Sequence, residues 1–366
     1  MAFPREGFVI DYVARILRSS LLHPHLILPT AVLISCAKLE FFPTPIPRFP
    51  LLEWLIYTLA ALTLLLSATE YLNDGAANNW TPSATINWKD EVIVVTGGSS
   101  GIGASLILRL HAERPQSTIA VVDYMPPTWT LPPGARIHFY QCDLSDASLI
   151  KDLCHRIRAD IGHPTMLINN AGICRGSTVA DGSYSDVTLT INTNLVAPFL
   201  LCKEFLPEMI RRDHGHIVNV ASMSALLPPG KIADYAATKA GLIALHEVVP
   251  GCALQLELRH DHPAPRVRLS LAIFSFIKTP LFKGETRQLH FLFPLLDVET
   301  VSQAIAGALY SGRSRTIYLP GMMRWVAILR GGPEWMWHLI RDSTKDLGVD
   351  FNGSNKSSAW RGSCRL

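Results

Sequence analysis

This 366-residue chain has none of the patterns that mark metal-binding, disulfide-stabilised or nucleic-acid-binding proteins. Its seven cysteines form no C-x-x-C pair, and their odd number argues against both a disulfide framework and a zinc site, so we expect reduced thiols. The net charge of +3 is small, and no basic cluster interleaved with aromatic residues indicates a nucleic-acid partner. His214 with His216, and His260 with His262, lack a carboxylate or cysteine at a spacing that would complete a metal site.

What the chain has is apolar sequence near its start. Residues 51–69 carry one charge, Glu53, and at about 1.5 Å per residue they nearly cross a hydrocarbon layer of roughly 30 Å. Residues 26–37 are preceded by Pro24 and interrupted by Pro29, which favours an interfacial or re-entrant segment. We predict a membrane-anchoring region over residues 1–88; the alternative is a buried core helix. The late start of the first apolar run, after several charges, argues against a cleaved signal peptide.

A strand, a tight turn and a helix follow in EVIVVTGGSSGIGASLILRL. Gly97 allows the turn, Gly101 lets the backbone approach a pyrophosphate, and Gly103 permits close packing of helix and strand. The next strand ends in Asp123, whose carboxylate can accept hydrogen bonds from the ribose of an adenosine. Since no Arg or Lys stands at residues 99 and 100 or directly after Asp123, the sequence favours NAD over NADP.

Two later strand ends complete the predicted cofactor site. RIHFYQCDLSD places Asp143 and Leu144 to meet the adenine, and NNAG lets the backbone pass close to the cofactor. The predicted cofactor contacts are Gly97, Ser99, Ser100, Gly101, Ile102, Gly103, Asp123, Asp143, Leu144, Asn170, Ala171, Gly172, Tyr235, Lys239 and Thr279.

Four residues are the predicted catalytic groups. Tyr235 and Lys239 stand one helical turn apart, so the ammonium would lie beside the phenol and favour its ionised form. Ser222 ends the apolar run HIVNVAS, from where its hydroxyl can donate to a carbonyl oxygen. Asn194, in the helical pattern INTNLVAPFLL, can hold a water that links Lys239 to solvent.

These motifs, in this order, resemble the short-chain dehydrogenase/reductase superfamily over about residues 91–320. The resemblance implies an α/β domain over residues 89–320, Rossmann-like and doubly wound, with a parallel sheet of about seven strands. It implies that Tyr235 is the acid/base, that Lys239 binds the nicotinamide ribose, that Ser222 positions the substrate oxygen and that Asn194 supports a proton relay. It also implies a homodimer that pairs through the helices carrying Asn194 and Tyr235.

FLPEMIRRDHGHIVNVAS, DYAATKAGLIALHE, TPLFKG and IYLP are similar to the membrane-associated branch of retinol dehydrogenase 10-like and 17-beta-hydroxysteroid dehydrogenase type 11-like enzymes. That likeness implies a lipophilic alcohol as substrate and a place on the endoplasmic reticulum or lipid droplets. The chain departs from the pattern at Phe274, where members carry Pro, although Thr279 remains available to bond the carboxamide. The proline-rich stretch YMPPTWTLPPGA predicts that the usual full helix is missing there.

The end of the chain offers a second membrane contact. Residues 321–342 predict an amphipathic helix in which Trp325, Trp335 and Trp337 suit a lipid headgroup region, or packing on the protein's own domain or a partner subunit. Residues 343–366 predict a disordered polar tail.

The orientation in the membrane stays open. A single span over residues 51–69 predicts a lumenal enzyme, whereas a hairpin of both apolar segments predicts a cytosolic one, which the reduced cysteines favour. The N-x-S/T sequons at Asn79, Asn352 and Asn355 would be glycosylated only on a lumenal domain.

The sequence therefore predicts a membrane-anchored, NAD-dependent alcohol dehydrogenase for a lipophilic substrate of retinoid, steroid or lipid type. One alternative is an NADP-dependent ketone reductase of lipid or secondary metabolism. Another, from a different class, is a membrane scaffold that keeps the dinucleotide fold without turnover.

Overall fold

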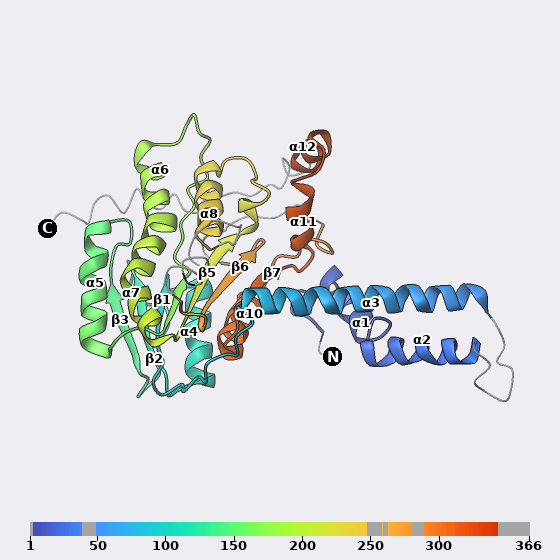
Figure 1. Cartoon of the computed structure of the whole chain (residues 1–366). Coiled ribbons are helices and arrows are strands. Elements are labelled where there is room, and N and C mark those ends of the chain that lie inside the picture. Colours follow the sequence, from blue (N-terminus) through green and yellow to red (C-terminus); the bar gives the residue numbers. More distant parts are fainter. Residues whose placement is uncertain are drawn as a thin grey trace. The chain divides into compact units, whose positions relative to one another are not determined.

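The computed structural model describes residues 3–38, 49–246, 258, 263–279, 281 and 289–342 (Figure 1). It divides into two compact units, Met1–Trp80 and Thr81–Leu366. The division lies eight residues before the predicted boundary at residue 89, because Ile86 and Trp88 pack against the core of the second unit. His260, His262 and the predicted tail lie outside the described residues.

The first unit consists of helices α1 (Ile10–Ser19), α2 (Pro24–Lys38) and α3 (Pro50–Ala77). The predicted segment 26–37 lies within α2, which continues past Pro29, and the segment 51–69 lies within the longer α3. α2 and α3 pack through a cluster formed by Ile27, Ala31 and Ala60. This cluster between α2 and α3 is small.

Length and composition make α3 a candidate membrane span. Its most apolar window has a mean hydropathy of 1.8, and 11% of that window is buried inside the protein. α1 and α2 pass the same test only when taken together, and they are bent by 48° at the break between them. The described residues therefore hold one candidate span, or two if the bent pair counts as one; membrane insertion itself stays a prediction.

The second unit is built on a parallel sheet in the order β3-β2-β1-β4-β5-β6-β7 (Figure 1). The chain starts in the middle of the sheet, runs outward to β3, and then crosses over to β4, so the strand order reverses between β1 and β4. The predicted seven-stranded Rossmann-like sheet is confirmed. Its strands are β1 (Val92–Thr96), β2 (Thr118–Asp123), β3 (Ile137–Gln141), β4 (Met166–Asn169), β5 (Gly215–Ser222), β6 (Val267–Phe274) and β7 (Thr316–Leu319).

Helices cover both faces of this sheet. Alternate residues of β1 point to opposite faces: Val94 packs with α5 and α7, while Ile93 and Val95 pack with α4 and α10. Burial on both faces explains why the strands read as continuous apolar runs in the sequence. The helices of this unit are α4 (Gly101–Glu113), α5 (Ala147–Ile161), α6 (Tyr184–Ile191), α7 (Ala197–Arg212), α8 (Ala233–His246), α10 (Val298–Ser311), α11 (Met323–Leu329) and α12 (Glu334–Asp342).

The connection between β2 and β3 contains no helix, as its prolines predict. Instead the loop folds back onto the glycine-rich turn. The Trp129 indole donates to the carbonyl of Gly98 over 3.0 Å, and the Thr128 hydroxyl donates to the carbonyl of Ser99 over 2.7 Å. The loop thus fixes the turn that follows β1.

Residues 321–342 form two helices rather than the single predicted one. α11 ends before the sequence Gly331-Gly332-Pro333, and α12 begins after it. Glycine lowers helix stability and proline lacks the amide donor that a helix interior needs, so this tripeptide interrupts the helix.

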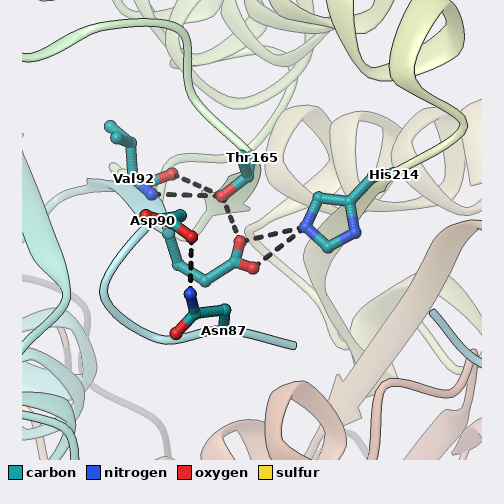
Figure 2. Close-up of polar contacts among 6 residues, drawn as sticks. Asn87, Asp90, Val92, Thr165 and His214 are labelled. Atoms are coloured by element: carbon teal, nitrogen blue, oxygen red, sulfur yellow. Dashed lines mark hydrogen bonds and ion pairs between the residues drawn. The ribbon is translucent and has the colours of Figure 1, made fainter. Parts of the chain in front are cut away.

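A buried carboxylate ties together the opposite edge of the sheet, at the start of the strands. Glu91 is 2% exposed; the Thr165 hydroxyl donates to it, and His214 Nε2 lies 3.0 Å from its carboxylate (Figure 2). The hydrogen bond to Glu91 raises the pKa of His214 above its usual value, against the opposing effect of burial. His216 has a different partner, the Ser270 hydroxyl at 2.8 Å.

Replacing His214 should change stability in a pH-dependent way. The folded-state pKa of His214 is raised, so its contribution is fully present below the pKa of the unfolded chain and is lost as the pH rises through the folded-state value. We expect His214→Gln, whose amide does not titrate, to lower the Tm more at pH 5.5 than at pH 9, measured in detergent micelles. His111→Gln, on α4, is the control. An equal loss for His214→Gln at both pH values would contradict the role of the protonated pair.

Candidate active site

The carboxyl ends of the parallel strands meet at one edge and form a cleft of about 570 Å³. The predicted cofactor residues that line it are Gly97, Ser100, Gly101, Ile102, Asp123, Asp143, Leu144, Asn170, Ala171, Gly172 and Thr279. They come from the loops after β1, β2, β3, β4 and β6, so segments scattered over 180 residues are brought to one place.

The turn after β1 leaves no room for side chains. Gly97 has a φ of +67°, and a Cβ on Gly103 would lie 2.2 Å from the Gly97 carbonyl oxygen. The Asn170 amide donates to the carbonyls of Thr96 and Gly97 over 2.9 and 3.2 Å, which joins the loops after β1 and β4. The N-terminus of α4 therefore faces the cleft with its backbone accessible, as a bound pyrophosphate requires.

Asp123 stands at the far end of the cleft, where β2 ends. Its two carboxylate oxygens each accept one backbone N–H, from Ser99 at 2.9 Å and from Met125 at 3.2 Å. Each oxygen keeps a lone pair for a ribose hydroxyl. The site thus fits the adenosine end of a nicotinamide dinucleotide.

Ser99 and Gly103, two of the predicted cofactor residues, do not line the cleft. Ser99 is 2% exposed, and its hydroxyl donates to the carbonyl of Met125 at 2.5 Å. A cofactor contact through the Ser99 side chain is therefore not supported by this geometry. Gly103 acts through the close approach of α4 to the turn.

Three of the four predicted catalytic groups, Ser222, Tyr235 and Lys239, line a second cavity of about 150 Å³, and Asn194 lies outside its lining. Ser222 is the last residue of β5, and Tyr235 and Lys239 lie one turn apart on α8. Ile102, Asn170, Gly172 and Thr279 line both this cavity and the cofactor cleft, so the two are adjoining. The remaining walls are mostly apolar and include Val220, Leu227, Ile232, Phe274, Phe276 and Ile277.

Lys239 is held at the base of the catalytic cavity. It is 3% exposed, and its ammonium donates to the Val220 carbonyl over 2.8 Å and lies 5.7 Å from the centre of the Tyr235 ring. A Cβ on Gly172 would lie 3.4 Å from this ammonium and 3.6 Å from Asn194 Oδ1. The loop after β4 therefore runs within van der Waals distance of Lys239 and Asn194 at Gly172.

Asn194 lies in η1 (Asn192–Val196), a π-helical turn between α6 and α7. Its side chain is fully buried, accepts from the backbone N–H of Ile173 and donates to the Ile173 carbonyl, both over 2.8 Å. It also contacts the Thr238 hydroxyl at 3.2 Å. Single π-helical turns widen a helix and occur often at functional sites. Here the turn brings Asn194 between the loop after β4 and α8.

Burial dominates the electrostatics of this cavity. It raises the pKa of Tyr235; the neighbouring Cys174 adds to the increase and a hydrogen bond with Ser222 opposes it. This direction is opposite to the lowered value that the sequence predicts, because loss of solvent outweighs the favourable charges around the phenol. Burial also lowers the pKa of Lys239 to about 8.

Two residues of the site escape the sequence analysis. Cys174 is 1% exposed and lines the catalytic cavity, and Arg175 lines the cofactor cleft while its guanidinium lies 3.4 Å from the carboxylate of Asp186 on α6. Both follow the NNAG motif directly. Their closeness to that motif is the one sequence signal that points to them, since neither residue type at this place carries a pattern of its own.

Comparisons with known proteins agree with this arrangement. A sequence model described as short chain dehydrogenase matches residues 91–289. The chain is 34% identical to Dehydrogenase RED2 of Cochliobolus heterostrophus over 59% of this chain and 79% of that protein. It is 27% identical to human Epidermal retinol dehydrogenase 2 over 68% of this chain and 80% of the relative.

A solved structure, 4-hydroxyisoleucine dehydrogenase complexed with NADH, matches with a TM-score of 0.53 and 23% identity. The match covers 62% of this chain and 97% of that one. This likeness shows the fold.

Removing the phenol hydroxyl should abolish turnover while leaving the fold intact. We expect Tyr235→Phe to lower kcat by about 10²- to 10⁴-fold, the usual contribution of a positioned proton-transfer group. Binding of NADH, followed by its fluorescence, should stay within a few-fold of wild type. Tyr184→Phe is the matched control, since that side chain is 96% exposed. Wild-type turnover by Tyr235→Phe would exclude the phenol as the acid/base.

Proposed function

This chain belongs to the short-chain dehydrogenase family and is an NAD(P)-dependent oxidoreductase acting on CH–OH groups; on that premise we propose that it interconverts a lipophilic alcohol and its carbonyl at a membrane, with NAD as cofactor. The observation that carries the proposal is the apolar catalytic cavity. Ser222, Tyr235 and Lys239 are its polar groups of predicted function, and they adjoin the cofactor cleft.

The residues of the cavity divide the chemistry among them. A bound nicotinamide supplies hydride transfer, which no side chain can perform. Ser222 donates to the substrate oxygen and holds it beside the Tyr235 hydroxyl, which exchanges the proton of the substrate. The ammonium of Lys239, 5.7 Å from the ring centre, favours the phenolate against the opposing effect of burial. We propose that Asn194 supports a water that connects Lys239 to solvent.

The choice of a lipophilic substrate rests on three observations. The cavity walls include Phe274 and Phe276, which the sequence offers as apolar walls. α3 has the length and composition of a membrane span, so the enzyme would lie where such substrates dissolve. The human relative is named a retinol dehydrogenase. We place the protein on the endoplasmic reticulum or lipid droplets, with the catalytic unit in the cytosol.

The preference for NAD rests on Asp123. Its carboxylate would repel the phosphate that distinguishes NADP, and the two residues that follow it, Tyr124 and Met125, are uncharged. Burial raises the pKa of Tyr235, so the phenol holds its proton, and the protonated phenol is the form that donates to a carbonyl oxygen in reduction. Ketone reduction with NADP is therefore the second candidate, supported by the phenol and opposed by Asp123.

The alternative of a membrane scaffold without turnover leaves the arrangement of the catalytic groups unexplained. Such a protein would have no reason to keep Ser222, Tyr235 and Lys239 around one cavity.

We propose a homodimer through the helices that carry Asn194 and Tyr235; on α7, Phe199 is 47% exposed and available for such a contact.

A substrate screen tests the proposed function. Retinoids, steroids and long-chain alcohols are supplied in lipid vesicles to the full-length protein with NAD or NADP, and product is measured by chromatography. We expect turnover of at least one lipophilic alcohol with NAD. Turnover restricted to small polar alcohols would overturn the assignment of substrate class.

Substituting Asp123 tests the cofactor argument. We expect the kcat/KM of wild type to be about tenfold or more higher with NAD than with NADP, which is the size of one unfavourable contact between like charges. Asp123→Ser removes that contact and should lower the ratio of the two kcat/KM values by a similar factor. Asp146→Ser, at the N-terminus of α5, is the control. A wild-type preference for NADP would contradict the ribose contact.

A further inference from the structure

α11 and α12 pack behind the wall of the catalytic cavity. On α11, Met323 and Val326 pack with Leu227 and Met223, and both of the latter also line the cavity. The guanidinium of Arg330 donates to the Ala225 carbonyl over 3.3 Å. That carbonyl belongs to η2 (Met223–Ala225), the turn directly after Ser222. α11 is thus one layer of side chains away from the substrate.

The opposite side of these helices exposes large apolar side chains. Trp325 and Ile328 of α11 are 58% and 65% exposed, and Trp335 and Leu339 of α12 are 66% and 63% exposed. The first pair is three residues apart and the second four, so each pair lies on one side of its helix. Trp337 and Ile340 of α12 pack inward. We call the four exposed residues the outer patch.

Four large apolar side chains exposed within fifteen positions form a cluster, and clustered exposed apolar surface marks an interaction site. A lipid bilayer is the occupant that fits. Tryptophan suits the boundary between hydrocarbon and headgroups, and Trp325 and Trp335 make up half of the outer patch. α3 of the same chain is a candidate span, which would keep the catalytic unit at a bilayer surface.

We propose that the outer patch rests on the bilayer and that the substrate enters the catalytic cavity from the lipid along α11. The inference rests on the proposed function in its choice of a lipophilic substrate. A molecule that dissolves in the bilayer is far more concentrated there than in water, so a wall that joins lipid to cavity spares the substrate an aqueous step. α11 packs against lining residues of the cavity on one side and exposes the outer patch on the other, and so supplies that connection.

Turnover of two alcohols separates entry from chemistry. The double variant Ile328→Glu, Trp335→Glu places charges in the outer patch, and Leu149→Glu, at an exposed position of α5, is the matched control. The full-length proteins are reconstituted in phosphatidylcholine vesicles with and without phosphatidylserine. We expect the double variant to lose about tenfold or more in kcat/KM for a vesicle-dissolved long-chain alcohol, through the loss of interfacial contact, and to match wild type on a short water-soluble one. Detergent micelles should restore the long-chain activity.

A second measurement does not depend on turnover. Brominated phosphatidylcholine quenches tryptophans that touch the acyl chains, and we expect the variant Trp325→Phe, Trp335→Phe to lose a large part of the quenching seen in wild type. Trp129→Phe, in the loop between β2 and β3, should lose none.

The outcomes are distinct. Unchanged quenching, or equal activity of the double variant on the vesicle-dissolved alcohol, overturns the proposal. Unchanged quenching together with dissociation of a dimer in the double variant would assign the outer patch to a second copy of the chain. If wild type turns over no alcohol but the variant Trp325→Phe, Trp335→Phe loses quenching, the bilayer contact stands. The proposed function then fails, and the proposed entry route fails with it.

Discussion

The parallel alignment of the strands is the constraint on which this protein depends. Because the strands of the sheet run in one direction, the ends of β1, β2, β4 and β5 meet at one edge, and the reversal of strand order between β1 and β4 opens the cleft there. Gly97 and Asp123 on one side, and Ser222 on the other, belong to one site for this reason. The opposite edge carries a structural cluster around Glu91 instead.

Close packing turns this edge into a reactive site. Lys239 and Asn194 lie beside the loop after β4 at Gly172, and burial shifts the pKa values of Tyr235 and Lys239. Burial keeps the Tyr235 phenol protonated and weakens the hold of Lys239 on its proton. Proton exchange in this cavity therefore depends on the balance between burial, which disfavours charge, and the ammonium, which favours the phenolate.

Two segments outside the sheet carry the apolar surface on which the proposed membrane location rests. α3 has the length and composition of a candidate span, and α11 and α12 pack behind the wall of the catalytic cavity while they expose apolar side chains outward. The walls of the catalytic cavity are themselves mostly apolar, so all three regions share a low affinity for water.

Local sequence determined the strands, the glycine-rich turn, the proline-interrupted loop after β2 and the pairing of Tyr235 with Lys239, because each follows from neighbouring residues or from one helical turn. Tertiary structure alone decided the inward turn of Ser99, the presence of Cys174 and Arg175 at the site, and the direction of the Tyr235 pKa shift. Burial and contacts between segments far apart in the chain set these features, and a linear pattern of residues carries no measure of either.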